Sequence, residues 1–270
     1  MRLENKEFNE QGYILIKNFF PVESIELVQT EAKEVFLKQF LALKLIESPV
    51  IDDSVFESTI VRLFNEHFEN YINCGKQAQH LISLHQLSLN KSLTERLNEL
   101  GLGFPVISTR PVMYFNKSKL AKSEEFYKVP PHQDWRSMQG SLNSIVVWVP
   151  LCDIDESLGA LKVIPGSHRM GLLDSSENAW FRQINEVDKK DFISVTVDKG
   201  DALFFSSFLI HASGDNIQDK IRWSCHFRYN DLNEETFIKR GYPNPYIYKP
   251  VQDLITPGFP KREQLQNVFL

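Results

Sequence analysis

The sequence predicts one β-rich domain, of the sandwich, barrel or jelly-roll kind, supported by helices from the N-terminal part of the chain. Segments rich in β-branched and aromatic residues follow one another after residue 104, and turn sequences such as DIDESLG, PGSH and DKGD separate them. No regular helical crossovers lie between these segments. Many strands joined by turns are typical of mainly β architectures.

Residues 1–103 are predicted to be mostly helical, with a short strand within 12–20. Apolar residues recur at helical spacing in three stretches, which are 25–40, 56–72 and 93–100. Ser92 and Glu95 fit a capping box at the start of the third helix, and Gly101 fits its C-terminal stop. This half of the chain is therefore expected to buttress the β core.

The strands are expected between residues 104 and 230. They cover 105–116, 143–151, 159–165, 192–197, 201–212 and 221–230. The proline-rich stretch 241–250 is expected to pack as an extended segment, because proline cannot donate to a sheet. No repeat, low-complexity tract or linker divides the chain. One domain over 1–270 is expected, with a helical buttress (1–103), a β core (104–230) and a C-terminal extension (231–270).

Composition and charge exclude several classes of protein. The 270 residues are 42% hydrophobic and 24% charged, which is usual for a globular protein. The net charge of −5 and the lack of a Lys/Arg cluster argue against a nucleic-acid partner. No apolar run approaches the roughly 18 residues of a membrane span. Three widely spaced cysteines without a CxxC motif favour a reducing compartment, so we expect a cytoplasmic protein.

The stretch PPHQDW (130–135) places His132 and Asp134 two positions apart. In a strand such residues point to the same face, so the pair is either a hydrogen-bonded surface pair or two ligands of a metal site. His211 ends the most apolar predicted strand, ALFFSSFLIHASG, where a polar residue needs a partner. Two histidines and one carboxylate are the composition of a mononuclear non-haem Fe(II) site with open coordination positions.

Arg222 begins the next predicted strand, eleven positions after His211 (222 − 211), and Ser213 lies two positions after that histidine. Across a tight hairpin, Arg222 would face back towards the metal. A buried guanidinium needs an anion, and its planar fork suits a carboxylate. The residues leave two interpretations equally open. One is an acidic co-substrate bound between the metal and Arg222, and the other is a structural salt bridge to an Asp or Glu.

Three segments together resemble the phytanoyl-CoA dioxygenase family of Fe(II)- and 2-oxoglutarate-dependent oxygenases. They are PPHQDW, SLNSIVVWVPLCDIDESLGALKVIPGSHRMG and VDKGDALFFSSFLIHASGDNIQDKIRWSCHFRY. The resemblance extends from about residue 8 to about residue 230. It implies a double-stranded β-helix, the jelly roll of cupin-like proteins, with helices packed outside. The iron ligands that it implies are His132, Asp134 and His211.

The same resemblance implies a co-substrate site. Arg222 would bind the distal carboxylate of 2-oxoglutarate with Ser213 nearby, and the other pocket residues would be Gln133, Trp148 and Met113. The implied reaction uses O2 and 2-oxoglutarate, releases succinate and CO2, and hydroxylates an unactivated C–H bond of a small molecule. Halogenating relatives replace the carboxylate ligand with a small residue, so the presence of Asp134 predicts hydroxylation. Trp148 also fits a large core residue in IVVWVPL.

Two other functions are compatible with parts of this pattern. A cupin-like enzyme with a non-redox metal has no use for Arg222 behind the metal. A degenerate, non-catalytic binding module does not need all four of His132, Asp134, His211 and Arg222. The sequence predicts neither the substrate nor the oligomeric state. Specificity is expected from the helical half, from the 117–129 loop and from the 169–190 insertion, since loops on a rigid scaffold usually carry it.

Overall fold

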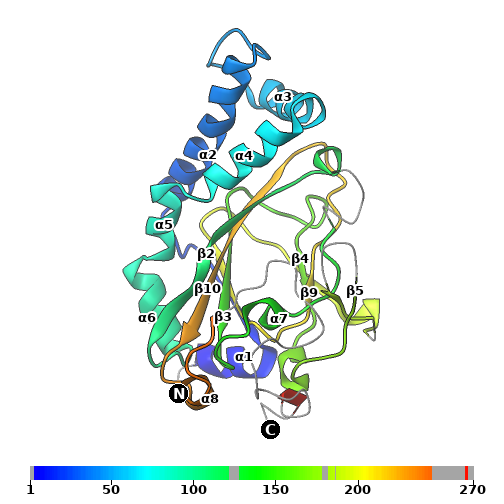
Figure 1. Cartoon of the computed structure of the whole chain (residues 1–270). Helices are drawn as coiled ribbons and strands as arrows, with labels where there is room; N and C mark the ends of the chain where they lie inside the picture. The colour runs from blue at the N-terminus through cyan, green and yellow to red at the C-terminus, as the bar shows by residue number, and fades with distance from the viewer. Residues whose placement is uncertain (1–2, 122–127, 178–181, 186, 245–264, 267–270) are drawn as a thin grey trace.

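The structure, a computed structural model, describes residues 3–121, 128–177, 182–185, 187–244 and 265–266. Two antiparallel sheets face each other, and helices cover the outer face of the larger one (Figure 1). The larger sheet has the strand order β1-β8-β3-β10-β2, and the smaller one has the order β7-β4-β9. A separate pair, β5-β6, lies in the 169–190 insertion.

The strands are β1 (Tyr13–Ile16), β2 (Pro105–Asn116), β3 (Ile145–Pro150), β4 (Leu161–Val163), β5 (Ser176–Glu177), β6 (Arg182–Gln183), β7 (Ile193–Val195), β8 (Ala202–Ser206), β9 (His211–Ala212) and β10 (Arg222–Asp231). The α-helices are α1 (Leu3–Gln11), α2 (Val22–Ala42), α3 (Asp53–Glu66), α4 (Phe68–Ala78), α5 (Ile82–Ser88), α6 (Lys91–Glu99), α7 (Trp135–Met138) and α8 (Glu235–Lys239). None of the helices in the described ranges is both long and apolar enough to cross a membrane.

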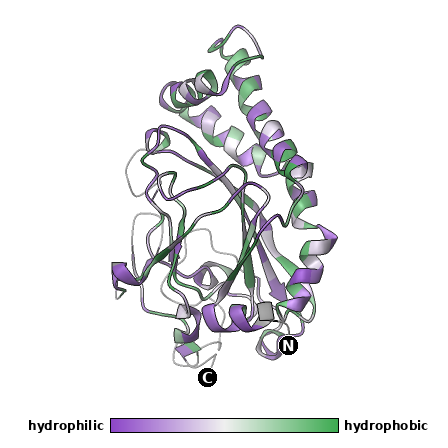
Figure 2. Cartoon of the chain, turned by 180° about the vertical axis from the view of Figure 1, so that it is seen from behind, coloured by the Kyte–Doolittle hydropathy of each residue, from purple (hydrophilic) through white to green (hydrophobic). Residues whose placement is uncertain are grey.

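The largest hydrophobic cluster lies between the helices and the larger sheet. Buried side chains of α2 recur at helical spacing from Ile25 to Phe40 and join this cluster. Phe36 of α2 packs its ring 5.3 Å from that of Phe115 on β2, which in turn lies 4.8 Å from Trp223 on β10. Burying each such side chain stabilises the fold by roughly 1.5–3 kcal/mol. The helices carry hydrophobic residues for this contact alongside hydrophilic ones (Figure 2).

Strand β10 has two faces of different chemistry. The side chains of Trp223, Cys225, Phe227 and Tyr229 belong to the cluster under the helices. Successive side chains of a strand point to opposite faces, so the alternate residues point into the space between the sheets. These are Arg222, Ser224, His226 and Arg228. A second hydrophobic cluster, with side chains from β3, β4, β7 and β8, fills the rest of that space.

Most predicted elements are confirmed, and four expectations are corrected. The stretch 201–212 is two strands, because the chain turns after β8 and enters the smaller sheet at β9. The second helical stretch breaks at His67 into α3 and α4. Helices α1 and α5 were not expected. Asn90, rather than Ser92, caps α6, since its Oδ1 accepts from the backbone N–H of Ser92 at 2.8 Å. Most of 241–250 lies outside the described residues.

Candidate metal centre

His132, Asp134 and His211 converge where the sheets meet, and one ligand atom from each lies within 4.8 Å of the others. Nε2 of His132 is 3.4 Å from Oδ1 of Asp134, and Nε2 of His211 is 4.0 Å from the same oxygen. Asp134 and His211 are buried and His132 is half-buried. Ligand atoms about 2.1 Å from one ion lie about 3–4 Å from each other, so these three side chains fit a single metal ion.

The backbone brings the two histidines together directly. His132 and His211 form an antiparallel bridge, in which each N–H donates to the carbonyl of the other at 3.0 and 3.1 Å. Asp134 lies outside any strand, at the N-terminus of α7, with helical backbone angles. The expectation of one strand that carries both His132 and Asp134 is therefore wrong. The chain leaves the bridge after His132 and turns into the helix, and this turn aims the carboxylate at the histidines.

Backbone carbonyls fix which nitrogen of each histidine faces the site. Nδ1 of His132 lies 2.8 Å from the carbonyl of Pro130, and Nδ1 of His211 lies 3.0 Å from that of Leu209. A carbonyl only accepts, so Nδ1 carries the proton and the lone pair of a neutral ring is on Nε2. Burial, with the neighbouring His132, lowers the pKa of His211 to about 3. The Nε2 lone pair of His211 is thus available to a metal at neutral pH.

Asp134 is held as a carboxylate by Arg228 of β10. Nε of Arg228 donates to Oδ2 of Asp134 at 3.0 Å, and both side chains are buried. Burial alone would raise the pKa of Asp134, but the Arg228 guanidinium and the two histidines hold that pKa well below its usual range. The other oxygen, Oδ1, is the one nearest both histidine nitrogens. No motif in the sequence marks Arg228, although period-two spacing puts it on the same face of the strand as Arg222.

Arg222 is buried at the first position of β10, with 4% of its surface exposed. Its Nη1 donates to the carbonyl of Gly159, and its Nε is buried with no partner. Burial lowers the pKa of Arg222 to about 10, which leaves the guanidinium charged at neutral pH. No carboxylate of the described residues lies within ion-pair distance of it. Within these ranges, therefore, nothing supports a structural salt bridge at Arg222.

The expected hairpin between His211 and Arg222 is absent. Strand β9 lies in the smaller sheet and β10 in the larger one, so the segment between them crosses from sheet to sheet. Ser213 is half-buried just after β9, where its N–H donates to the carbonyl of Val129 at 3.0 Å. The approach of Arg222 to the interior comes from its place on the inward face of β10, and not from a turn beside His211.

Of the remaining predicted pocket residues, Trp148 faces the interior and Met113 does not. Trp148 is buried in the cluster between the sheets, and it is the register partner of His226. Met113 is the register partner of Cys225 and lies in the cluster under the helices. Met113 therefore lies on the helix side of the larger sheet, and not on the face that carries Arg222. Its neighbour Tyr114 is on the inward face, with its ring 5.0 Å from that of His226.

Gln133 has its amide engaged by the backbone. Its Nε2 donates to the carbonyls of Gly171 and Phe208, each at 2.7 Å, and its Oε1 accepts from the N–H of Leu173 at 2.9 Å. Both amide protons are thus used within the protein. Gln133 joins three chain segments beside the metal ligands, and its contact with a co-substrate stays a prediction.

The sequence matches a known family over most of its length. The model of phytanoyl-CoA dioxygenase (PhyH) matches residues 8–224. The chain belongs to the phytanoyl-CoA dioxygenase family. The peroxisomal phytanoyl-CoA dioxygenase of Bos taurus is 26% identical over 277 residues, which cover 94% of this chain and 76% of that protein. Phytanoyl-CoA dioxygenase 1 of Oryza sativa subsp. japonica is 23% identical over 272 residues, or 90% of this chain and 95% of that one.

Solved structures show the same fold as this family member. The epimerase SnoN in complex with Fe3+, alpha ketoglutarate and nogalamycin RO has a TM-score of 0.57 at 17% identity, and the match covers 84% of this chain and 82% of that one. EctD from S. alaskensis, with 2-oxoglutarate and 5-hydroxyectoine, has a TM-score of 0.56 at 17% identity, covering 93% and 82%. The jelly roll with outer helices is thereby confirmed. As a member of this family, the protein is a dioxygenase that depends on iron and 2-oxoglutarate.

Proposed function

We propose that the protein hydroxylates an unactivated C–H bond of a small organic substrate, with O2 and 2-oxoglutarate as co-substrates and succinate and CO2 as products. In this proposal His132, Asp134 and His211 bind Fe(II), and Arg222 binds the distal carboxylate of 2-oxoglutarate. The observation that carries the proposal is Arg222 itself, a buried cation without a carboxylate partner in the described ranges, on the same face of β10 as the residue that holds Asp134.

The residues of the metal centre fit iron by number and by type. Two imidazole nitrogens and one carboxylate oxygen leave about three of six positions open for co-substrates. When bound, iron supplies the redox chemistry that activates O2. The protein holds the ligands in place through the carbonyls of Pro130 and Leu209 and through Arg228. Burial of Asp134 and His211 keeps bulk water away from the open positions.

A ligand with two acidic ends fits the inward face of β10. One end of 2-oxoglutarate would reach the metal, and the other end would supply the anion that the buried guanidinium of Arg222 requires. Between Arg222 and Arg228 lie Ser224, whose Oγ is buried, and His226, whose Nδ1 is buried, and neither atom has a partner among the described residues. Buried polar groups left without partners cost about 1–3 kcal/mol each, so a polar ligand along this strand is favourable.

The proposal also covers the type of reaction and the cellular compartment. Asp134 keeps one coordination position occupied by protein, which supports hydroxylation over halogenation. A reducing compartment, the cytoplasm, is supported by the three cysteines, which are all unpaired and include the buried Cys74 and Cys225.

The test is a visible spectrum of the protein reconstituted anaerobically with Fe(II), before and after addition of 2-oxoglutarate. Chelation of iron by the keto acid is expected to give a weak metal-to-ligand band, and O2 is then expected to yield succinate. Asp134→Ala should lose both signals, while Asp188→Ala, which removes an exposed carboxylate from a surface turn, should keep them. Near-normal turnover by folded Asp134→Ala would contradict the ligand assignment. A folded wild-type protein without the band would contradict the function.

A further inference from the structure

The segment between β9 and β10 leads directly into Arg222, whose side chain points into the interior. A helix contacts the end of this segment. Glu57 lies on α3, in the layer of helices outside the larger sheet. Its Oε1 accepts a hydrogen bond from the backbone N–H of Ile221 at 2.7 Å. Ile221 directly precedes Arg222, so the helix fixes the backbone at the point where β10 begins.

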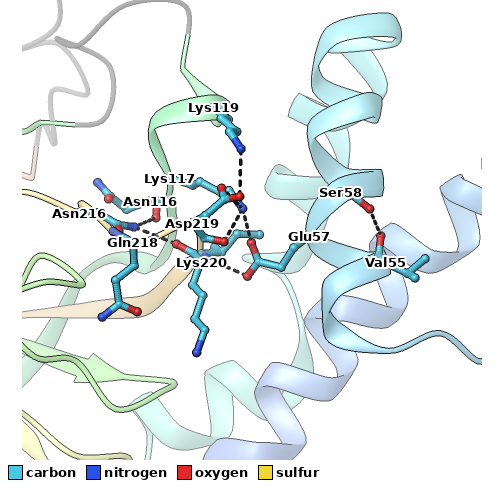
Figure 3. A network of polar contacts seen from close by, with 11 residues as sticks. Val55, Glu57, Ser58, Asn116, Lys117, Lys119, Asn216, Gln218, Asp219 and Lys220 are labelled. Carbon is cyan, nitrogen blue, oxygen red and sulfur yellow. Dashed lines mark hydrogen bonds and ion pairs between the residues drawn. The ribbon is translucent and has the colours of Figure 1, made fainter.

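A buried lysine completes this contact. Nζ of Lys117 lies 2.7 Å from Oε2 of Glu57 and 3.0 Å from Oδ1 of Asp219, and it donates to the carbonyl of Asp219 at 2.9 Å (Figure 3). The side chain of Lys117 is 3% exposed and that of Glu57 is 17% exposed. The sheltered pair of Lys117 with Glu57 thus ties α3 to the end of β2, and the contacts of Lys117 with the more exposed Asp219 tie both to the segment that leads into β10. Sheltered pairs of this kind are screened little by salt.

The start of the same segment is held against the loop that binds the Arg222 side chain. Asn216 forms an antiparallel β-bridge with Leu158. Its side-chain Nδ2 donates to the carbonyls of Asn116 and Lys220 at 2.8 and 2.9 Å (Figure 3). A Cβ at Gly159 would lie 2.9 Å from the carbonyl oxygen of Gly214, so the two stretches pack backbone to backbone. The carbonyl of Gly159 is the acceptor for Nη1 of Arg222.

These contacts make the position of Arg222 depend on the segment before it. Among the described residues, the side chain of Arg222 donates one hydrogen bond, to the carbonyl of Gly159. Its backbone is therefore the main restraint on where the guanidinium lies, and Glu57 holds that backbone one residue away. Arg228, which holds Asp134, lies six positions further along β10 (228 − 222). Glu57 contacts the backbone of Ile221 and the side chain of Lys117, and neither Arg228 nor the proposed ligands.

We propose that Glu57 is a positioning residue for 2-oxoglutarate: from α3, with Lys117, it fixes the start of β10 and so sets the Arg222 guanidinium for the distal carboxylate. The inference rests on the proposed role of Arg222. It gives a part of the helical half, which the sequence presents as a buttress and as a source of substrate specificity, a specific effect on the co-substrate. It also predicts that loss of Glu57 weakens 2-oxoglutarate binding but leaves metal binding unchanged.

The variants to compare are Glu57→Ala, Glu57→Gln and Asp53→Asn. Glu57→Ala removes both contacts, whereas Glu57→Gln keeps an acceptor for the N–H of Ile221 but loses the charge that faces Lys117. Asp53→Asn is the matched control, because Asp53 is an exposed carboxylate on the same helix and pairs with Lys33 of α2. Glu57 borders a cavity of ≈ 1020 Å³, so water can reach Lys117 when the carboxylate is removed, and the variants should fold.

Three measurements test the proposal. They are the affinity of the metal-free protein for Mn2+, the affinity of the Mn2+-loaded protein for 2-oxoglutarate, both by calorimetry, and amide hydrogen exchange of the metal-free protein. A hydrogen bond to a charged group has the strength to shift binding about tenfold or more, which is the loss of 2-oxoglutarate affinity expected for Glu57→Ala. Glu57→Gln should lose less. Mn2+ affinity should stay within about twofold, and exchange at Ile221 should be faster in Glu57→Ala.

Each other outcome overturns the proposal in a recognisable way. Wild-type affinity for 2-oxoglutarate in Glu57→Ala would show that the contact does not position Arg222. Equal losses of Mn2+ and 2-oxoglutarate affinity would show a general structural role. An equal effect of Asp53→Asn would show that the charge of α3, and not the contact, is responsible. If the wild-type protein binds Mn2+ but no 2-oxoglutarate, the proposed function itself is wrong, and the inference falls with it.

Discussion

At the scale of single residues, the candidate metal centre depends on groups that hydrogen-bond to the ligand side chains from outside the site. Two backbone carbonyls set the ring nitrogens of His132 and His211, and Arg228 holds one oxygen of Asp134. Each of these contacts fixes an atom on the side away from the proposed metal, and so leaves the opposite atom free to face it. Partners of this kind typically change metal affinity by about 10–100-fold when they are lost.

Arg228→Met is therefore expected to weaken Mn2+ binding by about 10–100-fold at neutral pH. Without the guanidinium, burial raises the pKa of Asp134, and a proton then competes with the metal for Oδ1. Calorimetric titration of the metal-free variant measures the loss. Arg62→Met, which removes an exposed arginine paired with Glu66 on α3, is the control and should bind Mn2+ normally. Unchanged affinity in a folded Arg228→Met protein would contradict the role of Arg228.

The residue scale is also where the sequence was most and least informative. The resemblance to the family names His132, Asp134, His211 and Arg222 as candidates from the sequence, and the structure brings the first three together. Met113 is implied only by the resemblance, and the structure places it in the cluster under the helices. A period of two tells which residues of a strand share a face, but not which face is inside. The register pairing of Met113 with Cys225 shows which face Met113 is on. A register between two strands cannot be read from the sequence of one strand.

At the scale of elements, the site depends on turns that the hydrophobic pattern does not reveal. The run ALFFSSFLIHA is mostly apolar and has no glycine or proline, so it predicts one strand. Ser206 nevertheless begins a turn, in which the N–H of Leu209 donates to its carbonyl at 2.8 Å. Because both halves are buried, hydrophobicity alone cannot separate β8 from β9. The chain also turns between His132 and Asp134, within a stretch that is not an apolar run. Each turn brings a candidate ligand into the site.

The packing of the segment before β10 against Gly159 gives a prediction at this scale. Gly159 has a φ of +84°, and a Cβ there would lie 2.9 Å from the carbonyl oxygen of Gly214 and 3.0 Å from the N of Asn216. Gly159→Ala is expected to lower the free energy of unfolding by about 2–4 kcal/mol, from the left-handed backbone together with this clash. It should also weaken 2-oxoglutarate binding, because the Gly159 carbonyl that holds Arg222 moves.

Gly101→Ala is the control for Gly159→Ala, since Gly101 has a φ of +107° but no heavy atom within 4 Å of the added Cβ. It should cost only the backbone strain, about 1–2 kcal/mol, and leave 2-oxoglutarate binding unchanged. Urea unfolding and calorimetry compare the two variants. Equal losses of stability would mean that the close approach of the two segments is not important.

At the scale of the whole molecule, the helical layer and the β core are coupled by one hydrophobic cluster and by the polar contact at Glu57. The alternation of polar and apolar residues along 221–230 already predicts a strand with two different faces. The sequence does not predict that helices cover one of these faces, because that needs the order of strands in the sheet. The fold class follows from composition and turns, whereas the link from α3 to Arg222 is a tertiary contact across 164 positions.

Acid should destabilise the metal-free protein as a whole, because the fold keeps several histidines neutral. Burial lowers the pKa of His168, His211 and His226 below the ordinary value of 6.5. Below that value the unfolded chain binds protons that the native state does not. The stability they contribute is therefore complete above about pH 6.5 and is lost as pH falls towards the folded pKa values, by up to about 1.4 kcal/mol per pH unit for each histidine.

His168 provides the test of this acid sensitivity, because its ring contacts the carbonyl of Asn9 and none of the proposed ligands. His168→Gln keeps an N–H donor for that carbonyl and removes the titration. Urea unfolding with a chelator present, at about pH 7.5 and about pH 5.5, is expected to show a smaller loss of stability in the variant than in the wild type. Identical losses would mean that His168 titrates alike in the folded and unfolded chains. If the loss of stability disappears in the variant, the acid sensitivity is due to His168 alone. The histidines of the candidate metal centre then do not contribute to it.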